Sequence, residues 1–323
     1  MAIIHFLNVK NGDCTLIQHS SGRNTLIDIS NGNDIKNFSE SALETLSPKG
    51  NFKQKLHPVD PIKYLQNLKI NEIFRFILTH PDMDHMDGIK RLFNSFKITN
   101  FWDTKNNKVI ENFGNNGSYK KEDWEFYQKL RNLNSKYTIL HLLSGSKNRF
   151  FNKDYNAQGV GDGLYILSPT KDLIEEANRT KDYNDCSYVI LYNKNNKKII
   201  FAGDSGKKTW DYILCEYKEL VSNIDILIAP HHGRKSGGND EYLDILKPKL
   251  TLFGNASSEH LDYSSWNNRN LQFITNNQVG SIILDTNGRD GIDIFITNEN
   301  FAKNFTKTSL YNKKYNAWYI KTI

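Results

Sequence analysis

The sequence contains few cysteines and no long apolar run. Three cysteines occur among 323 residues, none of them in a C-x-x-C pair, and an odd number argues against a disulfide framework. The longest apolar runs, residues 73–78 and 224–229, have the length of a strand, whereas a membrane-spanning helix needs about 20 apolar residues. The apolar stretch 3–9 includes His5 and Asn8 and has no basic segment before it, which makes a poor signal peptide. We therefore expect a protein of the reducing cytoplasm with no membrane partner.

Several familiar catalytic and nucleotide-binding patterns are also missing, because the sequence has no P-loop, no dinucleotide-binding glycine pattern and no Ser-His-Asp order. The composition is otherwise that of a globular protein, with 38% hydrophobic, 12% aromatic and 24% charged residues. Lysine and arginine number 42 against 36 aspartates and glutamates, which gives a net charge of +6. This excess permits an anionic partner but is too small to indicate a nucleic-acid-binding tail.

Strand-sized apolar runs alternate with helical spacings along the chain. In the first thirty residues, short β-rich runs are separated by Asn-Gly and Ser-Gly turns, which predicts an antiparallel start. The run 73–78 is almost wholly apolar, as in a strand buried on both faces. Helices are expected at 58–68, 86–93, 123–133, 207–220 and 264–275. Because strand-rich and strand–helix segments occur in both halves with no linker between them, we predict a single α/β domain, residues 1–323, with two sheets and helices outside.

Three polar clusters directly follow expected strands, where a strand end can present side chains at one edge of a sheet. They are His80-Pro81-Asp82-Met83-Asp84-His85, Gly203-Asp204-Ser205-Gly206 and Pro230-His231-His232-Gly233. Taken singly, each has an ordinary explanation: the first as a helix N-terminus capped by Asp82 or Asp84, the second as a turn and the third as a loop. Together they supply His, Asp and His-His from three strand ends, which is the ligand inventory of a binuclear metal centre.

The order and context of these clusters resemble the metallo-β-lactamase superfamily, and in particular the hydrolase domain of the ComEC competence proteins and its free-standing relatives. Those proteins carry LDVGQGD, HPDxDH, NxxS, LTGD and PHHG segments. This chain has LNVKNGD at 7–13, HPDMDH at 80–85, NDCS at 184–187, FAGD at 201–204 and PHHG at 230–233. The resemblance covers most of the chain and leaves the last twenty-odd residues uncovered. It implies an αββα fold, with two mixed β-sheets packed face to face and helices outside.

The resemblance also implies two divalent metal ions that share Asp204. The implied metal ligands are His80, Asp82, Asp84, His85, Asp204 and His232. Of the adjacent histidines, His232 is preferred as the ligand because superfamily members often have a glycine after the ligand histidine. His231 is then left to touch the substrate phosphate.

The chain departs from the family pattern in ways that bear on the metal. A lactamase-type centre takes a third histidine from a middle strand, where this chain offers Asn184 and Ser187. Asp82 also stands where the second histidine usually is, so the first metal position is rich in oxygen ligands. Hard oxygen ligands favour manganese over zinc, with magnesium as a further option. Asp13 and Asp28 remain as carboxylates expected to support the ligands from behind.

Other side chains near the clusters are candidates for contact with an anionic substrate. Cations a few residues from metal ligands suit a phosphoester, and a solvated basic face is the alternative explanation. The substrate-binding candidates are Arg234, Lys235, Lys207, Asn184 and Ser187. By resemblance, His260 either donates a proton to the leaving oxygen or is a surface histidine, and the turn 286–288 lines the same pocket.

The predicted activity is metal-dependent phosphodiester hydrolysis of DNA or another nucleotide polymer. Its catalytic residues would be Asp84, Asp204, His231 and His260. Two alternatives stay open. One is hydrolysis of a small phosphoester, such as a cyclic nucleotide or a choline phosphate headgroup. The other is a metal-stabilised binding or regulatory module with weak hydrolysis, an alternative that the missing middle-strand histidine keeps open.

Overall fold

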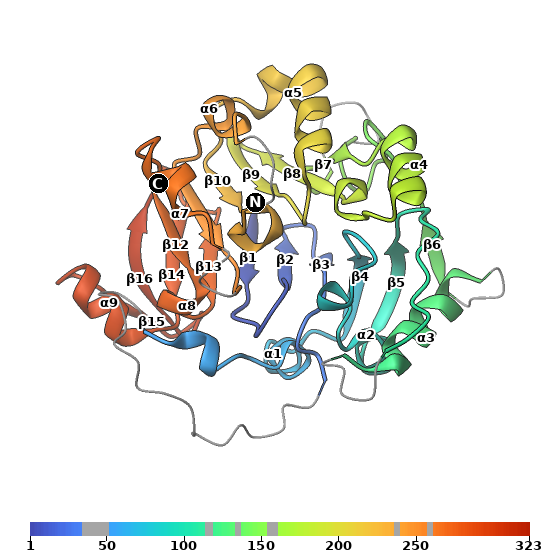
Figure 1. Ribbon diagram of the computed structural model, residues 1–323. Coiled ribbons are helices and arrows are strands. Elements are labelled where there is room, and N and C mark those ends of the chain that lie inside the picture. Colours follow the sequence, from blue (N-terminus) through green and yellow to red (C-terminus); the bar gives the residue numbers. More distant parts are fainter. Residues whose placement is uncertain (34–51, 114–118, 133–136, 154–160, 236–239, 257–260) are drawn as a thin grey trace.

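In a computed structural model of the chain, two β-sheets lie between two groups of helices (Figure 1). The structure describes residues 1–33, 52–113, 119–132, 137–153, 161–235, 240–256 and 261–323. The first sheet contains, among these residues, ten strands: β1 (Ala2–Phe6), β2 (Thr15–His19), β3 (Asn24–Ile27), β4 (Glu72–Ile77), β5 (Lys97–Trp102), β6 (Thr138–Leu140), β13 (Ile282–Asp285), β14 (Asp293–Ile296), β15 (Tyr311–Asn312) and β16 (Ala317–Thr322). The second sheet contains six described strands: β7 (Leu164–Ser168), β8 (Val189–Lys194), β9 (Lys197–Phe201), β10 (Ile226–Ile228), β11 (Leu250–Phe253) and β12 (Phe273–Thr275).

Both sheets are mixed. The ten-stranded sheet runs β15-β16-β14-β13-β1-β2-β3-β4-β5-β6, antiparallel up to β3 and parallel from β3 to β6. The six-stranded sheet runs β12-β11-β10-β9-β8-β7, parallel from β12 to β9 and antiparallel beyond it. The antiparallel start of the chain is therefore confirmed.

Six of the described helices cover the outer faces of the two sheets. The described helices are α1 (Pro61–Asn67), α2 (Ile89–Ser95), α3 (Lys121–Arg131), α4 (Lys171–Thr180), α5 (Lys207–Val221), α6 (Tyr242–Leu246), α7 (Tyr263–Asn267), α8 (Asn276–Val279) and α9 (Glu299–Phe305), with short 3₁₀ turns η1 (Gln54–Leu56), η2 (Met83–His85), η3 (Asn184–Cys186) and η4 (Pro230–Gly233). Helices α1, α2 and α3 pack on the ten-stranded sheet, and α5, α6 and α7 on the six-stranded sheet. No helix within the described ranges is long and apolar enough to cross a membrane.

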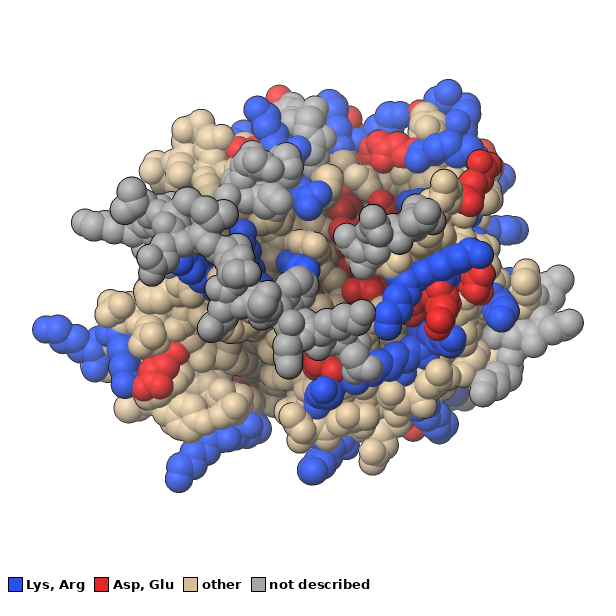
Figure 2. All heavy atoms as spheres, turned by 60° about the horizontal axis from the view of Figure 1, so that its bottom comes forward, with Lys and Arg blue, Asp and Glu red and all other residues tan. Residues whose placement is uncertain are grey.

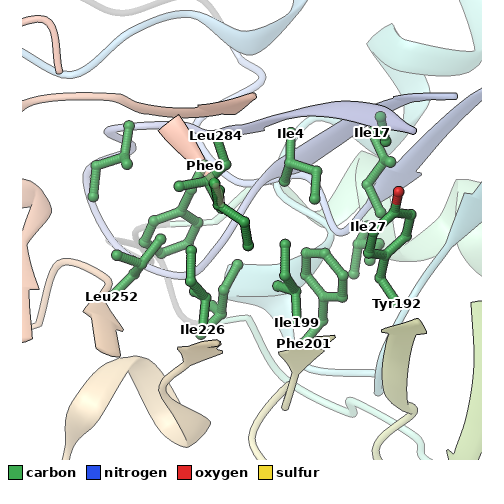
Figure 3. Packing of buried hydrophobic residues seen from close by; sticks show 14 of the residues in the cluster. Ile4, Phe6, Ile17, Ile27, Tyr192, Ile199, Phe201, Ile226, Leu252 and Leu284 are labelled. Carbon is green, nitrogen blue, oxygen red and sulfur yellow. The ribbon is translucent and has the colours of Figure 1, made fainter. Parts of the chain in front are cut away.

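The main hydrophobic core lies between the two sheets, as Figure 3 shows. Ile4 and Phe6 of β1 point toward Ile226 of β10 and Leu252 of β11, and all four side chains are fully buried. Alternate residues of the same strands face the outer helices; Leu227, for example, packs with the α5 and α6 side chains. This alternation of inner and outer apolar positions keeps the sheets face to face. The predicted layers, two mixed sheets with helices outside, are confirmed.

Two predicted helices differ from the structure. The segment 264–275 is a helix only up to Asn267, because residues 273–275 form β12 and pair in parallel with β11. The helix expected at 86–93 begins at Ile89, after Gly88 at φ 104°. A Cβ on Gly88 would lie 2.4 Å from Gly32 Cα, so close packing of the chain sets this boundary. Tertiary pairing and packing overrode the helical spacing in both segments.

A buried ion pair joins Arg75 of the ten-stranded sheet to Asp162, just before β7 of the six-stranded sheet. The sequence did not indicate this pair. Arg75, in β4, is 1% exposed and donates to Asp162 Oδ2 at 2.8 Å. Its guanidinium also donates to Thr25 Oγ1 and to the Phe150 carbonyl oxygen, each at 2.9 Å. Arg23, which is 26% exposed, holds the same carboxylate from the solvent side. The network joins Asp162, just before β7, and Phe150 to the ten-stranded sheet.

Candidate metal centre

The three polar clusters meet at one edge of the two sheets, where the strands that carry them end. His80, Asp82, Asp84 and His85 follow β4, in the segment that contains η2. Asp204 follows β9, and the two histidines of η4 follow β10. Because β9 and β10 are parallel neighbours, their carboxyl ends place Asp204 beside η4, and the His231 amide donates to the Gly203 carbonyl at 2.9 Å. The predicted convergence of the clusters is present in the structure.

Asp204 is the centre of the cluster, and its two carboxylate oxygens face different imidazoles. Oδ1 lies 3.1 Å from His85 Nε2 and 3.6 Å from His232 Nε2. Oδ2 lies 3.8 Å from His80 Nε2 and 3.7 Å from His231 Nε2. Each oxygen therefore has two imidazole nitrogens at its side, a pattern that suits one carboxylate shared by two cations.

Asp84 and Asp82 belong to opposite sides of this arrangement. Asp84 Oδ2 is 3.5 Å from His232 Nε2, and Asp84, His85 and His232 form one group able to hold a metal ion. A second such group consists of His80, His85 and Asp204. Asp82 Oδ1 is 3.9 Å from His80 Nε2 and accepts a hydrogen bond from Lys108. Lys108 comes from the segment after β5, and no sequence pattern indicated that it reaches the site.

Two carboxylates lie behind the imidazoles, as expected for Asp28 and Asp13. His85 Nδ1 donates to Asp28 Oδ2 at 2.7 Å, and Asp28 also accepts from the amide and the hydroxyl of Thr79, each at 2.7 Å. With Nδ1 bound in this way, the His85 ring presents Nε2 to Asp204, which is how proteins commonly fix the tautomer of a metal-binding histidine. His232 Nδ1 lies 3.1 Å from Asp13 Oδ1, near enough for charge attraction but without a hydrogen bond between them.

The conformation of η4 explains how neighbouring histidines serve the same centre. His231 and His232 both adopt left-handed backbone angles, with φ of 51° and 58°. Their rings consequently stand at 72° to one another, and each turns its Nε2 toward a different oxygen of Asp204. The His232 side chain is fully buried, whereas that of His231 is 23% exposed. The preference for His232 as ligand agrees with this burial, and His231 lies on the open side.

Residues 7–13, the LNVKNGD segment of the resemblance, pack directly against the turn that carries Asp84. Gly12 has φ of 74°, and a Cβ at this position would lie 1.9 Å from the Asp84 carbonyl oxygen. A side chain here would push the Asp84 turn away. Gly12 therefore allows the loop that carries Asp13 to approach the ligands.

The donor atoms fit metal ions. Within the described part of the chain, His80 Nε2, His85 Nε2, His232 Nε2 and Asp204 Oδ1 are buried without a hydrogen-bond partner. Buried polar atoms without partners are costly, and metal coordination is one way to satisfy them. Imidazole and carboxylate donors suit zinc, manganese or iron.

The charges of the cluster also favour a bound metal ion. Burial disfavours charge on His232, but the carboxylates around it, above all Asp204, raise its pKa to about 10. The pKa of His85 is raised well above its usual value by the same carboxylate, again against the effect of burial. Burial also opposes charge on Asp204, yet His232, His85 and His80 hold its pKa well below its usual value. The pocket thus attracts positive charge, which a metal ion can supply in place of protons.

The other predicted site residues are divided between the centre and the surface. Ser187 is buried, and its Oγ accepts a hydrogen bond from the Asp204 amide, so it supports the turn that carries Asp204. Arg234 directly follows η4 and is partly buried, while Lys235 is exposed. Asn184 lies in η3, partly buried, and Lys207 pairs at the surface with Asp211 at 2.5 Å. His260 lies outside the described residues.

The turn 286–288 does not line the site. The Thr286 hydroxyl donates to the Ala2 carbonyl oxygen at 2.9 Å, at the start of β1, whereas residues 7–13 of the site follow the end of β1. The register of β13 against β1 pairs Ile3 with Asp285 and so carries the turn to the opposite edge of the sheet. The antiparallel pairing excludes the expected role.

No family model and no curated protein matches the chain. Among solved structures, it is similar to the metallo-beta-lactamase fold protein YhfI from Bacillus subtilis, with 11% identity, 86% of this chain and 98% of that chain covered, and a TM-score of 0.46. A diphosphatase from the PhnP family shows 11% identity over 85% of this chain and 95% of its own, with a TM-score of 0.41. A variant of CmlA beta-hydroxylase shows 11% identity over 88% of this chain but 53% of its own length, with a TM-score of 0.45. At such identities, the reaction of this chain has to be argued from its own residues.

Removing the carboxylate behind His85 should weaken metal binding without removing a ligand. In Asp28→Ala the His85 ring loses the acceptor that fixes its orientation, so we expect metal affinity to fall roughly 10- to 100-fold. Asp28→Asn keeps an acceptor and should lose less. Metal affinity is measured by competition with a chromophoric chelator, and the unfolding temperature reports any general damage. Wild-type metal affinity in Asp28→Ala would show that Asp28 only holds Thr79.

Proposed function

We propose that this chain is a metal-dependent hydrolase that cleaves phosphodiester bonds. The supporting observation is the set of four imidazole Nε2 atoms that surround the two oxygens of Asp204. Two divalent ions held there would activate a water molecule as the nucleophile and stabilise the charge that develops on the phosphoryl oxygens. Asp84 and His232 belong to one side of the centre and Asp82 and His80 to the other.

The residues of the chain would prepare this site before substrate arrives. Asp28 holds His85 in the orientation that ligation needs, Asp13 places a negative charge beside His232, and Ser187 fixes the Asp204 turn. Divalent cations held at the centre would attract an anionic group to the open side of the site. The part-exposed His231 is on the side from which a phosphate could enter.

We propose a nucleotide polymer as the substrate, on the basis of the net positive charge and the family resemblance. One observation favours the second candidate, a small phosphoester. Lys207, expected near the substrate, pairs with Asp211 on the surface, and its neighbour Lys208 pairs with Glu176. On the face drawn in Figure 2, lysine and arginine side chains stand in several separate places and do not form one continuous stripe among the described residues.

The choice of metal stays a prediction. The expected preference for manganese over zinc depends on an oxygen-rich first position. His231 Nε2, however, approaches the same Asp204 oxygen as His80 Nε2, so this position has a second nitrogen within reach. This second nitrogen reduces the preference for manganese that the oxygen ligands suggested, and both manganese and zinc fit the donors.

A screen of metals against substrates tests the proposal. Metal-free protein is loaded with manganese, zinc or magnesium and given single-stranded DNA, RNA, a cyclic nucleotide or a choline phosphate ester, with a chelated control. We expect hydrolysis of oligonucleotides, with KM rising steeply with salt because several phosphates are contacted. Turnover of the small esters alone would support the second candidate. Tight metal binding with no turnover at all would contradict the proposed hydrolysis and leave a binding module.

A further inference from the structure

Lys108 is a cation at the edge of the metal centre, paired with the candidate ligand Asp82. Its Nζ lies 2.5 Å from Asp82 Oδ1, and its side chain is 20% exposed. Lys207, by comparison, is 53% exposed and pairs with an aspartate of its own helix. Lys108 thus reaches into the site from another part of the chain.

The backbone that carries Lys108 is held by a buried network. The Asp103 carboxylate accepts from Tyr127 Oη at 2.7 Å and from Arg131 Nε at 3.0 Å. Asn106 Nδ2 in turn donates to Tyr127 Oη at 2.9 Å, and Asn106 Oδ1 accepts from the Lys108 amide at 3.1 Å. The start of the Lys108 side chain is therefore fixed relative to β5 and α3.

Asn107, the residue before Lys108, is anchored by contacts with residues 178 and 183. The Asn107 amide donates to Asn178 Oδ1 at 2.7 Å, and Asn107 Oδ1 accepts from Tyr183 Oη at 2.9 Å. The Tyr183 ring itself lies under the ammonium group, with Lys108 Nζ 5.3 Å from the ring centroid. An aromatic face at this distance stabilises a cation even when its carboxylate partner is engaged elsewhere.

A metal ion on the His80 side and Lys108 would share the Asp82 carboxylate. If Asp82 coordinates a cation there, one of its oxygens can still accept from Lys108, but the ammonium group then faces a second positive charge at short range. Only the four-carbon side chain is free to turn, because the backbone is anchored. An ammonium group has three donor hydrogens, so Lys108 can pair with Asp82 and also donate to an anion bound beside the metal.

We propose that Lys108 binds a phosphoryl oxygen of the substrate on the His80–Asp82 side of the centre. The proposal rests on the proposed function for the class of anion. Lys108 stays next to the site while the segment 103–108 is held in place, with its charge stabilised by Tyr183 until the anion arrives. It would act in substrate binding, because an ammonium group donates charge-assisted hydrogen bonds to phosphate oxygens.

The test measures binding of inorganic phosphate to metal-loaded protein by calorimetry, with metal content determined in each variant. Lys108→Met should weaken phosphate binding about 10- to 100-fold, the range for a lost charge-assisted hydrogen bond, with metal content unchanged. Lys108→Arg keeps the charge and should recover part of the affinity. Lys249→Met is the matched control, because Lys249 also pairs with an aspartate, Asp225, at 2.8 Å, but at the start of β10 and β11, the opposite ends of these strands from the site.

Three results would overturn the inference: equal phosphate affinity in Lys108→Met and wild type, no phosphate binding by loaded wild-type protein, or loss of metal from Lys108→Met. The last result would mean that Lys108 only supports the ligands. Failure of the proposed function looks different, because phosphate binding would still depend on Lys108 while no phosphodiester was hydrolysed with any metal.

Discussion

Replacing Asp204 by asparagine should remove bound metal from both positions and reduce hydrolysis to the level of the chelated enzyme. Its two oxygens face four imidazole nitrogens at 3.1–3.8 Å, so an amide, with no charge and one oxygen, cannot serve both sides. We expect metal affinity to fall by more than the roughly 100-fold that is the upper range for removing a carboxylate that only orients a ligand. The four imidazoles would then lack the charge that holds them together.

Elemental analysis of the Asp204→Asn protein checks this expectation, with Asp211→Asn as the control. Asp211 is an exposed aspartate paired with Lys207, and its loss should change neither metal content nor rate. Two ions per chain in Asp204→Asn would contradict a shared ligand. Retention of one ion would instead limit Asp204 to a single position.

Replacing Arg75 by methionine should give the largest loss of stability among single substitutions in the described network. Asp162 would keep Arg23 as a partner but would lose a fully buried guanidinium, and the Phe150 carbonyl would lose its donor. Breaking a buried ion pair from one side costs roughly 3–5 kcal/mol, and the remaining Arg23 contact places the expectation near 3 kcal/mol.

Urea unfolding measures this loss. Arg23→Met, at the partly exposed end of the network, should lose less, and the double variant Arg75→Met with Asp162→Leu should recover part of the loss because no buried charge is left alone. A midpoint for Arg75→Met equal to that of wild type would show that water reaches Asp162.

The sequence predicted the centre well where the chemistry is local. HPDMDH, the Gly-Asp turn and PHHG each follow an apolar run, and the parallel neighbours β9 and β10 bring the last two segments to one sheet edge. HPDMDH follows β4 of the other sheet, so its meeting with them depends on how the two sheets pack. It could not predict Lys108, because the position of that side chain depends on how a distant segment packs. The pairing of Lys207 with Asp211, by contrast, follows from i,i+4 spacing in the predicted helix 207–220 and was not used. His231 and His232 face different oxygens of Asp204 because both adopt left-handed backbone angles. No pattern of residues in the sequence reveals those angles.

The errors have similar physical origins. Residues 273–275 carry apolar positions compatible with a helix, but pairing with β11 gives them backbone hydrogen bonds in a sheet. The turn 286–288 matched a short motif, yet antiparallel pairing of β13 carried it to the far edge. A short motif predicts chemistry only when the topology brings it to the site.

The origin of the candidate ligands would give a bound metal ion a mechanical role. Asp204, His231 and His232 extend from the six-stranded sheet, whereas His80, His85 and Asp28 extend from the ten-stranded sheet. An ion coordinated by both sets is a cross-link between the two halves of the sandwich. The free energy of metal binding is then added to the free energy of unfolding, because the unfolded chain offers no such site. Scarcity of the metal would consequently reduce the lifetime of the folded protein as well as its rate of reaction.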